Sequence, residues 1–173
     1  MHAEPDPTET RPWAEQIAST PATSGLDQSA IQRTLQQMCE QAGWPYAEAW
    51  SPSRDGTCQL LPAWYASDSG LDAFRRPTEA LHFMPRVGLP SRVLRSKRVM
   101  FVADVTTDPL FCRRTAARKA GVVGAIGVPI LAGETVAVVL VFFGRAIESP
   151  AWPKLAELAQ VATSRLGASP MRS

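Results

Sequence analysis

The stretch "VVGAIGVPILAGETVAVVLVFF", residues 122–143, contains two apolar runs on either side of a tight turn at "AGE". Apolar runs of this length that are rich in Val and Ile and bounded by a glycine-containing turn are typical of paired β-strands. The longest run, "VAVVLVFF", is too short to cross a bilayer as a helix. The stretch therefore predicts a hairpin of two long strands.

Upstream segments predict further strands of the same sheet, with helices inserted between them. Strands are predicted in "VMFVADV" (99–105), "WPYAEAWSP" (44–52) and "TCQLLPAWYAS" (57–67), the last two joined by an Asp-Gly turn signal. Pro62 within the third run indicates an edge strand or a bulge. Short helices are predicted in "LDAFRRPTEAL" (71–81), interrupted at Pro77, in "GLPSRVLRSKR" (88–98) and in "PLFCRRTAARKAG" (109–121).

Amphipathic helices are predicted at both ends of the sheet. In the first, Asp27 is the N-cap, Gly43 ends the helix, and the apolar positions are Ile31, Leu35, Met38 and Ala42. In the last, Ser149 is the N-cap, and the apolar positions are Leu155, Leu158, Ala162 and Leu166. This order of elements predicts an α+β fold. We expect a single domain over residues 26–167, a Pro-rich tail over 1–25 that is disordered or only loosely ordered, and a short C-terminal tail over 168–173.

Composition limits the chemistry that is available. Three cysteines without CxxC spacing and two histidines indicate free thiols and no metal site. The N-terminus lacks the order of a signal peptide, so we expect a cytoplasmic protein without membrane insertion. The net charge is +2, but residues 86–119 hold nine of the eighteen Lys and Arg residues against two acidic residues. This basic segment forms either a solvated helix face or a docking surface for an acidic complex.

The order of the motifs "GLPSRV", "VMFVADV", "DPLF", "RRTAARKAG", "GAIGVPIL" and "VAVVLVFF" resembles that of a GAF domain, of the type found in bacterial and cyanobacterial sensor histidine kinases. The resemblance covers roughly residues 27–167. It implies a central antiparallel sheet of about six strands. The N- and C-terminal helices are expected on one face, and short helices and loops are expected to roof a small-molecule pocket on the other.

Cys112 matches one feature of a subset of the family. Phytochromes and cyanobacteriochromes attach a linear tetrapyrrole through a thioether to a cysteine in the helix before the strand that here reads "GVPIL". In those relatives a histidine commonly follows the cysteine, whereas here the next residue is Arg113. A helix N-terminus together with Arg113 and Arg114 is expected to lower the pKa of the thiol. The alternative is that Cys112 fills space and has no chemistry.

Strand alternation assigns the aromatic candidates to faces of the sheet. Trp44, Tyr46, Glu48 and Trp50 are expected on one face, whereas Trp64 and Tyr65 are expected on opposite faces, with at least one of that pair in the core. The candidate ligand-binding residues are Cys112, His82, Trp64, Tyr65, Phe83 and Arg113.

Four functions follow from these features. The first is a stand-alone, non-enzymatic sensory module that binds a small ligand or a protein partner and signals to a separate protein through its terminal helices. The second is a bilin photoreceptor with its attachment at Cys112. The third is an enzyme of the GAF branch that reduces free methionine sulfoxide, and the fourth is a structural docking protein that uses segment 86–119. A homodimer formed through the terminal helices is expected in all four, and no nucleic-acid partner is expected.

Overall fold

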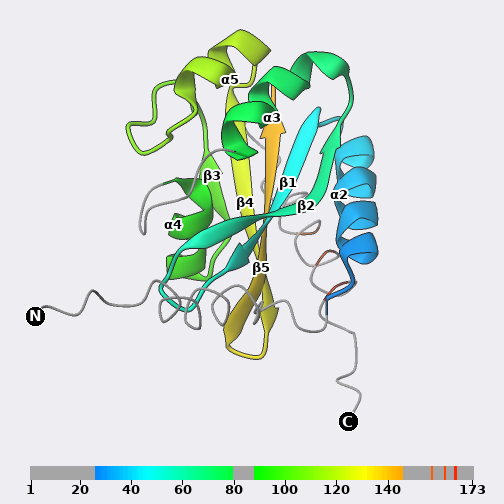
Figure 1. The fold of residues 1–173 in the computed structure, drawn as a ribbon, viewed down its shortest axis with the longest axis vertical. Coiled ribbons are helices and arrows are strands. Elements are labelled where there is room, and N and C mark those ends of the chain that lie inside the picture. Colours follow the sequence, from blue (N-terminus) through cyan, green and yellow to red (C-terminus); the bar gives the residue numbers. More distant parts are fainter. Residues whose placement is uncertain (1–25, 80–87, 146–156, 158–161, 163–165, 167–173) are drawn as a thin grey trace, which may run out of the picture.

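The computed structural model describes residues 26–79 and 88–145, together with Glu157, Ala162 and Leu166. In this part of the chain an antiparallel sheet of five strands, where about six were expected, carries helices on both faces (Figure 1). The strand order is β2-β1-β5-β4-β3, and the predicted α+β class is confirmed. The elements are α2 (Gln28–Ala42), β1 (Tyr46–Pro52), β2 (Cys58–Ala66), the 3-10 turn η1 (Ser69–Leu71), α3 (Asp72–Glu79), α4 (Leu89–Ser96), β3 (Met100–Val102), α5 (Arg114–Ala120), β4 (Gly124–Ala132) and β5 (Thr135–Gly144).

The hairpin predicted from residues 122–143 is confirmed as β4 and β5, which pair along their length. Gly133 turns the chain with a φ of 64°, a conformation that glycine adopts without a steric penalty. Pro129 lies past Gly127, the last β4 residue that pairs with β3. On that side β4 is an edge strand at Pro129, which fits the expectation for a proline between apolar strand residues.

The first hairpin, β1 and β2, is also confirmed, with its turn at Asp55 and Gly56. β2 is an edge strand, and its register with β1 shifts around Pro62, so this proline lies both at an edge and beside an irregularity. The backbone N–H of Trp64 donates to the side-chain oxygen of Gln32 over 2.9 Å, and the amide of Gln32 donates back to the Trp64 carbonyl. A helix side chain thus pairs with the open edge of the sheet.

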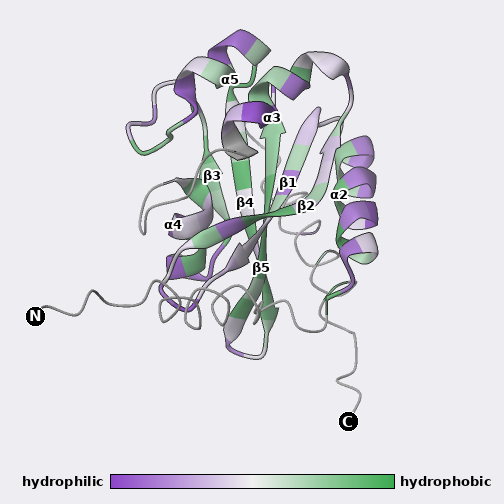
Figure 2. Cartoon of the chain, in the orientation of Figure 1, coloured by the Kyte–Doolittle hydropathy of each residue, from purple (hydrophilic) through white to green (hydrophobic). Residues whose placement is uncertain are grey.

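The first helix begins and ends where its capping residues predict. Asp27 accepts a hydrogen bond from the N–H of Ser29 over 3.0 Å, and Gly43 ends α2 with a φ of 71°. Hydrophilic residues lie on the outer side of α2, whereas hydrophobic residues lie on its inner side and along the central strands (Figure 2). The buried residues of the helix are Ile31, Thr34, Leu35, Met38 and Cys39.

Part of the predicted closing helix joins the same side of the sheet. Ala162 and Leu166 are buried with the apolar residues of α2 and with the strand residues that face them. Ser149, Leu155 and Leu158 lie outside the described residues. The predicted tails at 1–25 and 168–173 lie outside them as well.

The opposite face is covered by α3, α4 and α5, and here two expectations were wrong. Pro77 does not interrupt its helix, because it lies inside the eight-residue α3, where it removes only the one hydrogen bond that its own N–H would make. The predicted helix from residue 109 begins only at Arg114. The preceding residues form turns instead, because the side chain of Asp108 accepts from the N–H of Leu110 over 2.9 Å and favours a turn. Gly121 ends α5 with a φ of 67°, as predicted.

Candidate functional site

A carboxylate lies in the middle of the sheet, on the face that α3, α4 and α5 cover. Glu48 is in β1 and is completely buried. Because side chains two residues apart share a strand face, Tyr46 and Trp50 lie beside it, as predicted. The Tyr46 hydroxyl and the Trp50 indole N–H each donate a hydrogen bond to Glu48 over 3.1 Å.

Arg113 brings the opposite charge to Glu48 from a distant part of the chain. It is the N-cap residue of α5, and its guanidinium donates to the two Glu48 carboxylate oxygens over 2.6 and 3.2 Å. The Arg113 and Glu48 side chains are 3% and 0% exposed. A bidentate pair of this kind is the strongest form of side-chain hydrogen bonding, and burial strengthens it further.

Three phenylalanine rings surround the guanidinium. The Cζ atom of Arg113 lies 4.4 Å from the ring centroid of Phe74, 5.3 Å from that of Phe143 and 5.5 Å from that of Phe111. These distances are within the range of cation–π attraction. We call Tyr46, Glu48, Trp50, Phe74, Phe111, Arg113 and Phe143 together the Glu48–Arg113 cluster.

The hydroxyl of Tyr46 is kept protonated within this cluster. Burial, and then the negative charge of Glu48, raise the pKa of Tyr46 far above its usual range. Each Glu48 oxygen accepts two hydrogen bonds, one from Arg113 and one from an aromatic residue of β1. The arrangement is therefore suited to holding charge in place, because neither oxygen is left to take a proton from a substrate.

The structure brings only part of the predicted site together. Arg113 is in the cluster, and Trp64 lies next to it, with its ring centroid 6.4 Å from that of Tyr46 and the Arg75 guanidinium 4.3 Å above its ring. Tyr65 packs with the core of the α2 face, so Trp64 and Tyr65 point to opposite faces as predicted. Neither is fully buried, contrary to the expectation that at least one would be core. His82 and Phe83 lie outside the described residues.

Glu48 is the residue that the sequence-based site prediction missed. A usable signal was present, because the pattern Tyr46, Glu48, Trp50 places one acid between two aromatic residues on the same strand face. A carboxylate at such a position must find a partner when the face is buried. Its partner lies 65 residues further along the chain, and no local pattern identifies it.

Cys112 differs in two ways from the expectation. It is exposed and lies in the turn before α5, not within the helix. Partial desolvation of the thiol raises the pKa of Cys112, and this outweighs the lowering effect of the Arg113 charge. The expected activation of the thiol was therefore wrong, because Arg113 directs its charge to Glu48.

The other two thiols are buried on opposite sides of the sheet. Cys39 belongs to the α2 face and Cys58 to the opposite face. Burial raises the pKa of Cys39 to about 12 and that of Cys58 to about 11. All three cysteines are free thiols, and the sheet separates the two buried ones.

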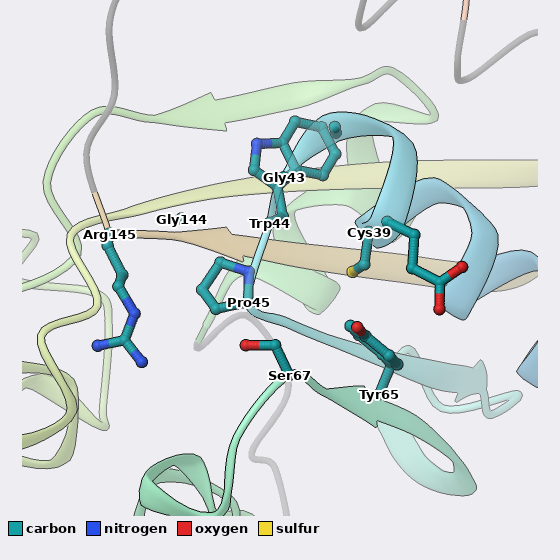
Figure 3. A pocket seen from close by; sticks show the side chains of 10 residues that line it. Cys39, Gly43, Trp44, Pro45, Tyr65, Ser67, Gly144 and Arg145 are labelled. Atoms are coloured by element: carbon teal, nitrogen blue, oxygen red, sulfur yellow. The ribbon is translucent and has the colours of Figure 1, made fainter.

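A pocket of about 550 Å³ lies away from the cluster, at the C-terminal end of α2. Arg145 lies on one side of it and Tyr65 on the other, with Pro45 and Ser67 between them (Figure 3). Trp44 also lines it and packs on Phe142, with 5.3 Å between the ring centroids. Trp44 is thus on the α2 side and not with Tyr46 as predicted, because it precedes the first residue of β1.

Several cations of the basic segment 86–119 bond to neighbouring loops in the described part of the chain. Arg92 pairs with Asp108 at 2.8 Å. The Lys97 ammonium donates to the carbonyl of Glu134, and the guanidinium of Arg118 donates to that of Thr106. Arg86 lies outside the described residues.

The described residues contain no group of three or more His, Cys, Asp or Glu side chains placed to hold a metal ion. None of the helices within 26–79 and 88–145 is both long enough and apolar enough to span a membrane.

Comparisons with known proteins identify the family. Residues 28–162 match the family model of the GAF domain. No curated protein matches the sequence. Among solved structures, the GAF domain of a phosphoenolpyruvate-protein phosphotransferase from Coxiella burnetii is similar, with 18% identity, a TM-score of 0.63 and coverage of 90% of this chain and 86% of that one.

Two other structures show how widely this fold is used. The GAF domain of a two-component sensor histidine kinase from Bacillus halodurans has 14% identity and a TM-score of 0.61, over 83% of this chain and 93% of that one. A free methionine-R-sulfoxide reductase from Neisseria meningitidis, solved with its substrate, has 18% identity and a TM-score of 0.60, over 98% of this chain and 96% of that one. At such identities these structures show a shared fold, and with the family match they establish that this chain belongs to the GAF domain family.

Proposed function

We propose that the chain is a non-enzymatic regulatory GAF module that senses a small molecule at the Glu48–Arg113 cluster and passes the signal to another protein. The observation that carries the proposal is the ion pair buried among aromatic rings on one sheet face. Burying two charges costs solvation free energy, and apolar residues of similar volume often serve stability equally well. The buried ion pair therefore supports a functional role for this face of the sheet.

The sheet supplies a short path from the cluster to the opposite face. Tyr46, Glu48 and Trp50 alternate along β1 with Ala47 and Ala49, which pack in the core beneath α2. A ligand that shifts β1 by a fraction of an ångström therefore acts on α2 directly, because packed cores transmit strain. We infer that α2 and the closing helix carry the output, in a homodimer formed through these helices.

Thiol chemistry fits this chain poorly. The raised pKa values of Cys39, Cys58 and Cys112 leave little thiolate at neutral pH, and thiolate is the reactive form. The sheet also keeps the two buried thiols from forming a disulfide with each other. These features support a module that binds and does not reduce a substrate.

A metabolite screen tests the sensory site. Small molecules that raise the melting temperature of the wild type are titrated by calorimetry into Glu48→Gln and, as a matched control, Tyr65→Leu in the pocket at the end of α2. We expect Glu48→Gln to weaken the binding of a true ligand at least about tenfold, and Tyr65→Leu to leave it unchanged. A ligand that binds Glu48→Gln as tightly as it binds the wild type contradicts the proposal.

Two simpler measurements test the remaining parts. With free methionine-R-sulfoxide and dithiothreitol, we expect no more methionine from the wild type than from the same mixture without protein. Rapid turnover would show that the module is an enzyme. Light scattering should give twice the chain mass as concentration rises. A single-chain mass at every concentration would exclude the proposed dimer.

A further inference from the structure

The Glu48–Arg113 cluster has the chemistry of a binding site for a planar organic cation. Its negative end is a carboxylate that the Tyr46 hydroxyl and the Trp50 indole hold in one orientation. Its walls include the rings of Phe74, Phe111 and Phe143, and ring faces attract cations. A carboxylate facing aromatic rings is an environment that selects guanidinium and substituted ammonium groups.

The cation inside this cage belongs to the chain itself. Only the side chain of Arg113 reaches inward, because its neighbours Cys112 and Arg114 are both exposed. Arg113 is the N-cap residue of α5 and is joined to the helix through its backbone carbonyl, which accepts from the N–H of Ala117 over 2.9 Å. Its side chain can therefore leave the cage while α5 keeps its own hydrogen bonds.

We propose that Arg113 is an internal ligand, which occupies a cation cage formed by Glu48 and the surrounding rings, and that small guanidinium compounds compete with it for this cage. The identity of the signal that the module senses rests on the proposed function, whereas the existence of the cage does not. Displacement of Arg113 moves its guanidinium out of the cluster, beside the exposed residues Cys112 and Arg114. Occupation of the cage by a free cation is thus coupled to a change at the surface of the module.

Tethering determines how strongly the chain competes. A group attached to the protein acts at an effective concentration of millimolar or higher, which a free cation must overcome. The wild type should therefore bind a guanidinium compound much more weakly than a variant whose cage is empty. We expect the difference to be at least about tenfold.

The test uses methylguanidinium as the probe and the variant Arg113→Ala. The readout is the indole N–H resonance of Trp50 in a ¹⁵N-labelled protein, assigned with Trp50→Phe, because this group bonds directly to Glu48. In Arg113→Ala we expect the Trp50 resonance to shift saturably at millimolar methylguanidinium. The wild type should bind the probe at least about tenfold more weakly. The double variant Glu48→Gln/Arg113→Ala should show no saturable shift. Urea, which has a similar planar shape but no charge, should give no saturable shift.

A matched variant separates the cage from an ordinary ion pair. Arg92→Ala removes an arginine whose partner, Asp108, is also mostly buried. Within the described residues, Arg92 differs from Arg113 in having no cation–π contact with an aromatic ring. The Arg92→Ala variant should gain no methylguanidinium site. Equal binding to Arg113→Ala and to Arg92→Ala, or binding to Arg113→Ala that survives the Glu48→Gln change, would overturn the cage.

Folding itself serves as the readout if Arg113→Ala is unfolded without the probe. Circular dichroism should then show recovery with millimolar methylguanidinium and none with urea or with sodium chloride of equal ionic strength. No recovery in the variant and no shift in the wild type would also overturn the proposal. The proposed function and the proposed cage can fail separately. The metabolite screen can identify a ligand that is not a cation, while the Arg113→Ala variant still binds methylguanidinium.

Discussion

The two faces of the sheet are built in different ways, although they share the same strands. The α2 face is apolar throughout its centre, with Ile31, Leu35 and Met38 packed on alanine, valine and isoleucine side chains of the strands. The opposite face places large aromatic rings around a buried pair of charges. An apolar face is sufficient to hold helix and sheet together, so the second face contains more than folding requires.

The difference indicates a division of labour between the faces. Apolar burial is non-directional and tolerant, so it stabilises the fold without selecting a ligand. Buried charge is directional, and it is costly whenever one partner is missing. Both faces contribute apolar burial to stability, and the recognition that we propose belongs to the face of α3, α4 and α5, which alone of the two carries the buried ion pair.

The largest expected effect comes from breaking the ion pair on one side only. Glu48→Gln keeps the shape of the side chain but leaves the Arg113 charge in an apolar environment. We expect the free energy of unfolding to fall by about 3 to 5 kcal/mol, measured by urea denaturation with circular dichroism. The control is Glu40→Gln on the exposed side of α2, which should change it by less than about 0.5 kcal/mol. Equal effects for the two variants would contradict the account.

A cavity on the α2 face should lower the free energy of unfolding by almost as much, without affecting the Glu48–Arg113 cluster. Leu35 is completely buried, so Leu35→Ala should lower the free energy of unfolding by about 2 to 5 kcal/mol. The Trp50 indole resonance should keep its position in the folded variant, because the sheet lies between the two sites. A displaced Trp50 resonance would show that the faces are not separable in this way.

On the face that carries the ion pair, a substitution against the closely packed α4 should change the free energy of unfolding by less. A Cβ at Gly127 would collide with Val93 and lie 3.2 Å from Leu89, both residues of α4. Gly127→Ala should therefore lower the free energy of unfolding by about 1 to 3 kcal/mol, since α4 must move outward. Gly133→Ala is a useful comparison, because its cost comes from a φ of 64° and not from a neighbouring side chain. A fully neutral Gly127→Ala would contradict this packing.

The smallest effect concerns thiol reactivity, which leaves the fold intact. A raised pKa means less thiolate at a given pH. Cys39 and Cys58, whose pKa values are about 12 and about 11, should therefore not react with Ellman's reagent in the folded protein at pH 8. The exposed Cys112 alone among the three should react, and slowly, at a rate that increases as the pH rises toward its raised pKa. Rapid reaction of Cys112 at neutral pH would instead support its activation.

The same shifts predict how stability depends on pH. Both buried thiols keep their protons to a higher pH in the folded state than in the unfolded state. The contribution of the two protonated thiols to the free energy of unfolding is therefore fully present below about pH 9, and it is lost as the pH rises through 11 and 12. The free energy of unfolding should decrease in this window, and it should decrease less in Cys39→Ala. If the free energy of unfolding decreased with pH as steeply in Cys39→Ala as in the wild type, this would argue against the raised pKa of Cys39.

Local sequence signals were enough for most of the fold. Asp27 and Gly43 mark the ends of α2, and Gly133 and Gly56 mark hairpin turns, because each acts on its own few residues. The turns before α5 were mistaken for helix, since Asp108 competes for backbone groups in a way that apolar spacing does not reveal.

The candidate site was less accessible from sequence. Arg113 is among the candidate ligand-binding residues predicted from the sequence, but its partner Glu48 is not. The pairing of the two depends on how β1 is packed against the turn before α5. Trp64 and Tyr65 were assigned to one site although they face opposite sides of the sheet. Alternation gives the face of a strand residue, whereas the contacts of that face are decided by tertiary packing.

The most direct test of the division between the faces is a double-mutant cycle of Glu48→Gln and Arg113→Met, with the free energy of unfolding as the measured quantity. If the charges serve recognition and not stability, removing both at once should cost less than removing either one, because no unpaired charge stays buried. A double variant at least as destabilised as the less stable of the two single variants would contradict this division, because the paired charges would then themselves be needed for stability.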